Sequence, residues 1–235
     1  MSTTLLTRYD PLRMPEKIRT VLFDLDGTLA DTAPDLGFAL NTLVEEAGRP
    51  PVPYAAIRAQ ASHGARGLIQ LGFGVSVADP DFDALRSRFL KIYGEHLCDK
   101  TVLFPGMADV LAALQKNNLN WGIVTNKPSF FTDRLVRALQ LEAQASCVVS
   151  GDTTKNSKPH PEPLLFACAK AGSTPHQCLY VGDAARDIEA GRRAGMKTLI
   201  ALFGYLHPED QPNSWGADGM IQTPQEILAW LDKNA

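Results

Sequence analysis

The sequence predicts an α/β protein whose core is a doubly wound, Rossmann-like parallel sheet, accompanied by a smaller helical unit. The first observation is that short apolar runs alternate with helical patterns from residue 105 onward. The second is that helical patterns dominate residues 34–98. Helices that follow short apolar strands in this way cover both faces of a parallel sheet. Ligand sites in such sheets form beyond the carboxyl ends of the strands, so a functional site is expected there.

The first elements follow from local signals. Residues 21–23 are a short run of strand-forming apolar residues and predict the opening strand. Thr32 offers a capping hydroxyl and precedes a proline and an acid, so a helix is expected to begin there and run to Gly48. Further helices are predicted at residues 54–61 and from 82 to about 96. Residues 62–67 form a polar, glycine-interrupted stretch between these two helices.

The second half of the chain alternates strands with helices. Strands are predicted at residues 121–125, 147–150, 178–182 and 197–202. Helices are predicted around residues 110–114 and 135–139 and at residues 162–171 and 186–194. Residues 1–17 are polar and proline-punctuated, and we expect them to form a loose N-terminal arm.

The composition is that of an ordinary globular protein of enzyme size. Of its 235 residues, 45% are hydrophobic and 21% charged, and the net charge of −3 offers no basic field for nucleic acid. No apolar stretch is long enough to span a bilayer and no secretory start is present, so we expect a cytoplasmic protein. The four cysteines form no close pair along the chain, which predicts neither a zinc site nor a disulfide framework. The sequence does not choose between a monomer and a homodimer.

Two carboxylates close the opening strand. Asp24 and Asp26 are one residue apart, so both can face one ligand while the chain is extended. Their repulsion must be offset by a cation or a shared proton. Gly27 lets the backbone turn and a ligand approach closely. A plain Asp-Gly hairpin turn is the alternative, but it requires neither Asp24 nor the Thr28 that follows.

Three further segments carry polar groups where strands or loops end. Thr125, Asn126 and Lys127 can bind phosphate oxygens through side chains or backbone N–H groups. Asp183 and Asp187 are four residues apart and can crowd one pocket if a helix begins near Ala184. Lys158 stands in a loop that two prolines stiffen. Taken singly, helix caps, a first-turn acid and a surface amine would explain them as well, but their shared placement makes coincidence improbable.

Together these residues resemble the four signature motifs of the haloacid dehalogenase superfamily, specifically its phosphatases. The motif residues are Asp24 to Thr28, Thr125, Lys158 with Pro159, and Asp183 with Asp187. The likeness covers nearly the whole chain from Val21 onward. It implies an α/β core of residues 18–33 and 105–235, with residues 34–104 inserted as a helical cap. Ala184 departs from the family, which often has Ser or Thr there, and this removes one hydroxyl near the metal.

The resemblance implies a phosphatase that hydrolyses a small phosphomonoester in two steps. Asp24 would be the nucleophile that forms an aspartyl phosphate, and Asp26 the general acid and base. An oxygen-rich site without a His or Cys cluster favours Mg²⁺ over zinc. The implied Mg²⁺ ligands are Asp24, the backbone carbonyl of Asp26, Asp183, and Asp187 through a water. The groups implied to hold the phosphate are Thr125, Asn126 and Lys158, with Gly27 beside them.

The cap is expected to determine substrate specificity. Arg66 could bind a substrate carboxylate bidentately and His63 could hydrogen-bond it, although both could equally be solvated cap residues. Within the family the chain resembles phosphoglycolate phosphatases, so 2-phosphoglycolate is the default substrate. The tail from Phe203 to Asp210 and the stretch from Ser62 to Arg66 look more like a branch that dephosphorylates N-acetylmuramic acid 6-phosphate in peptidoglycan recycling. The sequence favours 2-phosphoglycolate over N-acetylmuramic acid 6-phosphate only slightly.

Two more distant functions stay open. A sugar phosphomutase would keep both aspartates of the first motif but would have to protect its phosphoenzyme from water. A non-catalytic relative that only binds a partner would be expected to have lost Asp24, Asp26 or Lys158, and none is missing.

Overall fold

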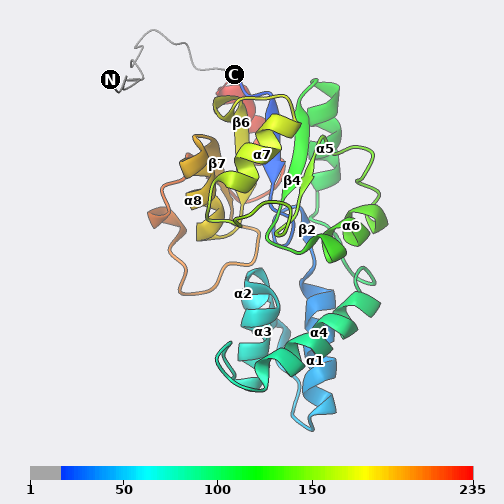
Figure 1. Ribbon diagram of the computed structural model, residues 1–235. Helices are drawn as coiled ribbons and strands as arrows, with labels where there is room; N and C mark the ends of the chain where they lie inside the picture. The colour runs from blue at the N-terminus through cyan, green and yellow to red at the C-terminus, as the bar shows by residue number, and fades with distance from the viewer. Residues whose placement is uncertain (1–16, 235) are drawn as a thin grey trace, which may run out of the picture.

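The computed structural model describes residues 17–234, so the predicted N-terminal arm lies outside the described residues except for Lys17. Six parallel strands form one sheet in the order β5-β4-β1-β6-β7-β8 (Figure 1). The strands are β1 (Thr20–Phe23), β4 (Asn120–Val124), β5 (Val148–Val149), β6 (Cys178–Gly182), β7 (Lys197–Ala201) and β8 (Gly219–Ile221). This architecture confirms the predicted fold class.

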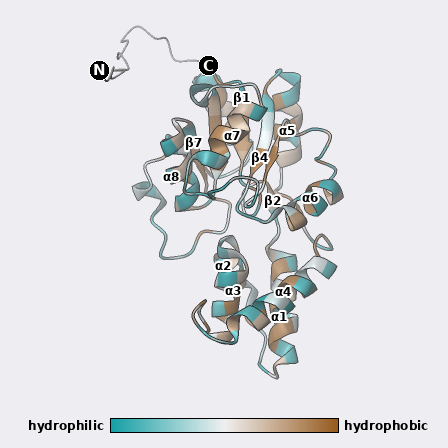
Figure 2. Cartoon of the chain, viewed as in Figure 1, coloured by the Kyte–Doolittle hydropathy of each residue, from teal (hydrophilic) through white to brown (hydrophobic). Residues whose placement is uncertain are grey.

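The central strands are buried because helices cover both faces of the sheet. On one face, apolar residues of α7 (Glu162–Lys170) and α8 (Ala185–Ala194) pack on Leu22, Val124 and Tyr180. On the other, α5 (Met107–Lys116), α6 (Ser129–Ala138) and α9 (Glu226–Lys233) belong to the cluster that holds Val21 and Phe23. Figure 2 shows the apolar character of β4 between more polar helix surfaces.

The register of the sheet brings three strand ends together. Phe23, the last residue of β1, lies opposite Ile123 of β4 and Val181 of β6. The chain visits β4 and β5 on one side of β1 and then β6, β7 and β8 on the other. Strand order therefore reverses next to β1, and in open α/β sheets the carboxyl ends at such a point form the ligand crevice.

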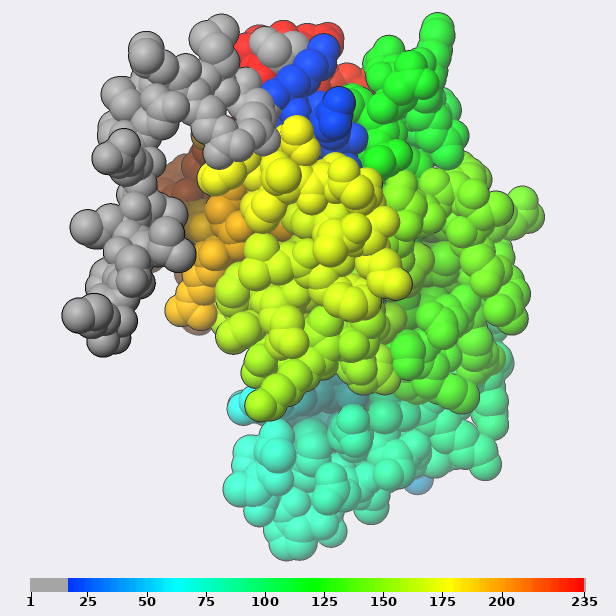
Figure 3. Space-filling view, turned by 45° about the horizontal axis from the view of Figure 1, so that its top comes forward, coloured from blue at the N-terminus to red at the C-terminus, as the bar shows by residue number. Residues whose placement is uncertain are grey.

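Four helices make up a second unit, which we call the cap (Figure 1). They are α1 (Ala33–Glu46), α2 (Tyr54–Gln60), α3 (Gly64–Phe73) and α4 (Phe82–Glu95), with the 3₁₀ turn η1 (Ala61–His63) between α2 and α3. Two short antiparallel strands, β2 (Ala30–Asp31) and β3 (Val102–Leu103), connect the cap to the core. In the space-filling view the cap forms a lobe below the core (Figure 3).

A buried carboxylate ties the two connections together. Asp35, in the first turn of α1, accepts hydrogen bonds from the backbone N–H groups of Lys100 and Thr101 and from the Thr101 hydroxyl. The acid that the sequence predicts as a first-turn residue of the helix therefore also fixes the chain where it leaves the cap.

The helix α3 is absent from the sequence prediction, which has only a polar stretch at residues 62–67. Its glycines permit close packing: a Cβ at Gly72 would lie 2.9 Å from Leu40 Cδ1 of α1, and one at Gly67 only 2.4 Å from His63 Cβ. Leu68 and Ile69 are buried in the same helix. Tertiary packing thus overrides the low helix propensity of glycine here. The strand β8 and the helix α9 were also not predicted.

Two general features complete the fold. Within residues 17–234, no helix combines the length and the apolar character that crossing a membrane requires. All four cysteines are free thiols, although the fold places Sγ of Cys168 within 3.2 Å of Sγ of Cys178.

Candidate active site

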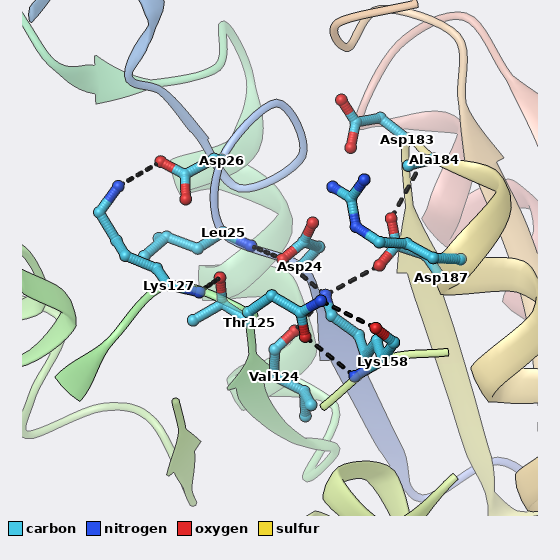
Figure 4. A network of polar contacts seen from close by, with 12 residues as sticks. Asp24, Leu25, Asp26, Val124, Thr125, Lys127, Lys158, Asp183, Ala184 and Asp187 are labelled. Carbon is cyan, nitrogen blue, oxygen red and sulfur yellow. Dashed lines mark hydrogen bonds and ion pairs between the residues drawn. The ribbon is translucent and has the colours of Figure 1, made fainter. Parts of the chain in front are cut away.

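Three acidic side chains converge beyond the strand ends (Figure 4). Asp24 follows β1, Asp183 follows β6, and Asp187 lies in the first turn of α8. Each offers a carboxylate oxygen within 4.8 Å of the others, and all three residues are buried. Buried carboxylates this close require compensating charge.

Lys158 supplies part of that charge. Its ammonium Nζ lies 2.8 Å from Asp24 Oδ1 and 2.8 Å from Asp187 Oδ1, and it also donates to the Val124 carbonyl at 2.9 Å. Asn126 holds this lysine in place: its Nδ2 donates to the Lys158 carbonyl at 2.9 Å, and its Oδ1 accepts from the Lys158 N–H at 3.0 Å. Both groups of the Asn126 amide are therefore engaged with the lysine backbone.

The directions of the pKa shifts indicate that the nearby positive charges offset the burial of Asp24 and Asp183 only in part. Burial, followed by the charges of Asp24 and Asp187, raises the pKa of Asp183 to about 7. Burial also raises the pKa of Asp24, and the attraction of Lys158 offsets this only partly. For Asp187, burial acts upward on the pKa, but Lys158 and Arg186 outweigh it and lower the pKa.

The geometry fits a divalent cation. Asp183 Oδ1 is buried and accepts no hydrogen bond among the described residues, which leaves one carboxylate oxygen without a partner inside the cluster. Buried polar atoms normally have partners, so this oxygen points to a missing ligand. Within residues 17–234 the cluster consists of three carboxylates and includes no His or Cys, which suits a hard, oxygen-preferring cation.

Asp26 is separated from this cluster and has its own partners (Figure 4). Its Oδ1 accepts hydrogen bonds from Thr32 Oγ1 at 2.6 Å and from Lys127 Nζ at 2.7 Å. The sequence predicts Thr32 as a helix cap, but its side chain makes no capping hydrogen bond. Burial would lower the pKa of Lys127, but the Asp26 carboxylate outweighs it and raises the pKa. Lys127, predicted as a phosphate-binding candidate, is therefore paired with Asp26 in the structure.

Gly27 permits a close approach within the protein. Its φ is +85°, and a Cβ there would lie 2.1 Å from Asp183 Oδ2 and 2.8 Å from Tyr205 Cδ2. Any side chain at this position would displace the Asp183 carboxylate. Asp183 and Tyr205 therefore account for the glycine at this position, and the predicted close approach of a ligand to Gly27 stays a prediction.

A cavity of about 770 Å³ lies between the core and the cap. Asp24, Asp26, Thr125 and Asn126 line it from the core. The cap contributes both predicted residues, His63 and Arg66, and further side chains that include Ser62, Gln60, Gln70 and Arg86. Within the described residues, neither Arg66 nor Arg86 has an ion-pair or hydrogen-bond partner, and both are exposed, so these two guanidinium groups are open to a ligand in the cavity.

Arg86 and Arg186 were missed as site residues from the sequence. Arg86 lies in α4, 39 positions before Thr125, the nearest motif residue, and no local pattern separates it from Arg88 two positions further on. Arg186 stands inside the last motif between Asp183 and Asp187, and it donates from the core to the Ser62 carbonyl of the cap at 2.8 Å. Its position between Asp183 and Asp187 is the one feature of the sequence that indicates a role in the site.

The chain matches the family model described as haloacid dehalogenase-like hydrolase over residues 21–201. An N-acetylmuramic acid 6-phosphate phosphatase of Pseudomonas putida is 43% identical over 216 residues, which cover 92% of this chain and 97% of that protein. A phosphoglycolate phosphatase of Xanthomonas campestris is 40% identical over 215 residues, covering 90% and 97%.

Solved structures agree with this assignment. The crystal structure of a predicted phosphoglycolate phosphatase from Haemophilus somnus has a TM-score of 0.80 and 27% identity, and the match covers 91% of this chain and 97% of that one. The resemblance inferred from the motifs is thereby confirmed. The chain belongs to the haloacid dehalogenase-like hydrolases and is a phosphatase of that family.

Proposed function

We propose that this protein is a Mg²⁺-dependent phosphatase that hydrolyses N-acetylmuramic acid 6-phosphate through an aspartyl-phosphate intermediate. The observation that carries the proposal is the cavity in which unpaired Arg66 and Arg86 share one space with Asp24 and Asp26. Arginines at a cavity wall without a partner among the described residues suit a substrate carboxylate. N-acetylmuramic acid 6-phosphate carries a carboxylate in addition to its phosphomonoester.

The size of the cavity favours a sugar phosphate over a two-carbon acid. Pockets of roughly 300–1,000 Å³ typically enclose molecules of drug size, and this cavity measures about 770 Å³. Gln60 and Gln70 add amide groups that can hydrogen-bond sugar hydroxyls and an acetamido group. Two relatives named N-acetylmuramic acid 6-phosphate phosphatase, 43% and 42% identical, support the same substrate.

2-Phosphoglycolate is the second candidate. It is the default from the sequence, and the Xanthomonas campestris relative of that name supports it. It also carries a carboxylate, so the arginines suit it too. We place it second because it would leave most of the cavity to water.

In the first step, Asp24 attacks phosphorus. Its Oδ1 accepts hydrogen bonds from Lys158 Nζ and from the Leu25 N–H, which leaves Oδ2 free for the attack. The ester P–O bond breaks as the Asp24–phosphorus bond forms, and the leaving alkoxide takes a proton from Asp26. Thr32 and Lys127 both hold Oδ1 of Asp26, so Oδ2 is the oxygen available to the substrate.

In the second step, water attacks phosphorus and Asp26 takes its proton. The Asp24–phosphorus bond breaks, phosphate leaves, and both carboxyl groups return to their initial state. Thr125, which lines the cavity, and Lys158, whose ammonium contacts Asp24 beside it, would hold the transferring oxygens, whereas Asn126 would position Lys158. Asp24, Asp183 and Asp187 would hold Mg²⁺, which would supply positive charge to offset that of the carboxylates and the phosphate.

A substrate panel tests the proposal. We expect kcat/KM to be highest for N-acetylmuramic acid 6-phosphate, lower for 2-phosphoglycolate and lowest for p-nitrophenyl phosphate, with turnover lost in EDTA and restored by Mg²⁺. A higher kcat/KM for 2-phosphoglycolate would reverse the order of the two candidates. Folded protein that releases no phosphate from any of the three in Mg²⁺ would favour a non-catalytic binding protein instead.

Replacing the cap arginines should separate substrates by their carboxylate. Arg66→Ala and Arg86→Ala remove unpaired charges from the cavity wall. A hydrogen bond to a charged group contributes about 1.5–3 kcal/mol, so kcat/KM for N-acetylmuramic acid 6-phosphate should fall roughly 10- to 150-fold for the arginine that binds the carboxylate. Turnover of p-nitrophenyl phosphate, which has no carboxylate, should change less than about threefold.

Arg88→Ala is the matched control for Arg86. It lies on the same helix two residues away but pairs with Glu46 outside the cavity. We expect it to behave like wild type on all three substrates. An equal loss on p-nitrophenyl phosphate and the carboxylated substrates in both cavity variants would reject the role of these arginines.

A further inference from the structure

A turn of the cap touches a residue of the metal-site cluster directly. Ser62, in the middle of η1, donates a hydrogen bond from Oγ to Asp183 Oδ2 at 2.8 Å. The backbone N–H of Tyr205 donates to the same oxygen, also at 2.8 Å. The other oxygen, Oδ1, is buried and without a hydrogen-bond partner among the described residues. One oxygen of Asp183 is thus held by two protein groups, and the other makes no hydrogen bond to the described residues.

The Ser62 contact belongs to a larger junction between the cap and the core. Arg186 of α8 donates from Nη2 to the Ser62 carbonyl at 2.8 Å. From the cap side, Arg58 donates to the carbonyls of Phe203 and Gly204 at 2.8 Å each, and its guanidinium lies 5.1 Å from the centre of the Tyr205 ring. The two arginines therefore fasten η1 on one side and the segment that contains Tyr205 on the other.

The junction continues to the connection between cap and core. The Tyr205 hydroxyl donates to Asp31 Oδ1 of β2 at 2.7 Å and accepts from the Ala33 N–H at 2.9 Å. Tyr205 thus contacts Asp183 through its backbone and the base of the cap through its side chain. A cap movement at β2 would disturb the residues that orient Asp183.

We propose that Ser62 is a positioning residue that orients Asp183 Oδ1 toward the cation, so that metal affinity depends on the cap being seated on the core. This inference rests on the proposed function, because it takes Asp24, Asp183 and Asp187 as the Mg²⁺ site. Ala184, next to Asp183, has no hydroxyl of its own, so Ser62 provides the side-chain hydroxyl on this carboxylate. By linkage, a cap that strengthens metal binding is itself held closed more firmly by the metal.

The first experiment measures Mg²⁺ affinity directly. Full-length protein is titrated with Mg²⁺ alone, without substrate, by isothermal titration calorimetry. Loss of a group that orients a metal ligand typically costs about 10- to 100-fold in affinity, so Ser62→Ala should raise the Kd for Mg²⁺ at least about tenfold. Ser62→Thr keeps the hydroxyl and should stay within about threefold of wild type. Ser87→Ala, an exposed serine of α4, is the control and should not change the Kd.

The second experiment distinguishes coupling from simple loss of order. Amide hydrogen exchange is followed by mass spectrometry with and without saturating Mg²⁺. In wild type and Ser62→Thr, Mg²⁺ should slow exchange of cap peptides that span residues 58–66. In Ser62→Ala the metal, even at saturation, should leave exchange of these peptides unchanged.

The two experiments distinguish failure of the Ser62 inference from failure of the proposed function. A wild-type Kd in Ser62→Ala, or an equal rise in Ser87→Ala, would overturn the inference while leaving the proposed function intact. Slowing of the cap peptides by Mg²⁺ in Ser62→Ala to the wild-type extent would overturn it as well. Wild-type protein that binds no Mg²⁺ would overturn both the inference and the proposed cofactor.

Discussion

Asp24→Asn should abolish phosphatase turnover while leaving the fold intact. An amide cannot act as the nucleophile at phosphorus, and uncatalysed phosphomonoester hydrolysis is slow enough that enzymes accelerate it by up to ~10²¹-fold. We expect kcat with p-nitrophenyl phosphate to fall by at least about 10⁴-fold. Asparagine has the same shape, and its Oδ1 can still accept from the Leu25 N–H and Lys158.

The Asp24→Asn substitution should not lower the stability of the folded protein, although it abolishes turnover. The pKa of Asp24 is raised mainly by burial, so its ionised form is less favourable in the folded protein than in the unfolded chain. Replacing it by a neutral amide removes that cost. In EDTA, the free energy of unfolding of Asp24→Asn should therefore be equal to or higher than that of wild type, measured by urea denaturation.

The matched control is Asp109→Asn, an exposed acid in the first turn of α5. It should keep wild-type turnover. Retention of more than about 1% of wild-type kcat by Asp24→Asn, with the amide verified by intact mass, would show that another group is the nucleophile. A large loss of stability would show that the carboxylate is structural.

The strand ends were predictable because their signals are local. The apolar run before Asp24 and the one before Asp183 each predict a buried strand, and parallel strands place their carboxyl ends at one edge. The sequence therefore specifies which acids meet without specifying distances. The motif resemblance added Lys158, whose loop position alone would fit a solvated amine equally well.

The contacts across the cap were not predictable in the same way. Ser62 contacts Asp183, 121 positions away along the chain, because the packing of helices α1 to α4 places η1 against the core. The local sequence predicts Thr32 as a helix cap, but its hydroxyl donates a hydrogen bond to Asp26 instead. Such choices depend on which acceptor the tertiary structure brings nearest. Hydrophobic periodicity carries no information about that choice.

Lys158→Met should remove activity and also destabilise the protein. The ammonium is buried between Asp24 and Asp187, 2.8 Å from each, and methionine fills similar space without charge. Removing one partner of a buried ion pair typically costs about 3–5 kcal/mol because the remaining charge is uncompensated. We expect a fall of that size in the free energy of unfolding in EDTA, together with a loss of p-nitrophenyl phosphate turnover of at least about 10³-fold. Lys155→Met, an exposed lysine of the same loop, should change neither.

A second substitution separates the two effects. Adding Asp187→Asn to Lys158→Met removes one of the two carboxylates left without a counter-charge, so part of the lost unfolding free energy should return. Turnover should not return, because the charge proposed to contact the transferring phosphate is still missing. Recovery of activity with stability would mean that Lys158 acts only through folding. Wild-type stability in the single variant would instead mean that Asp24 and Asp187 are compensated by other groups, with Arg186 the nearest candidate.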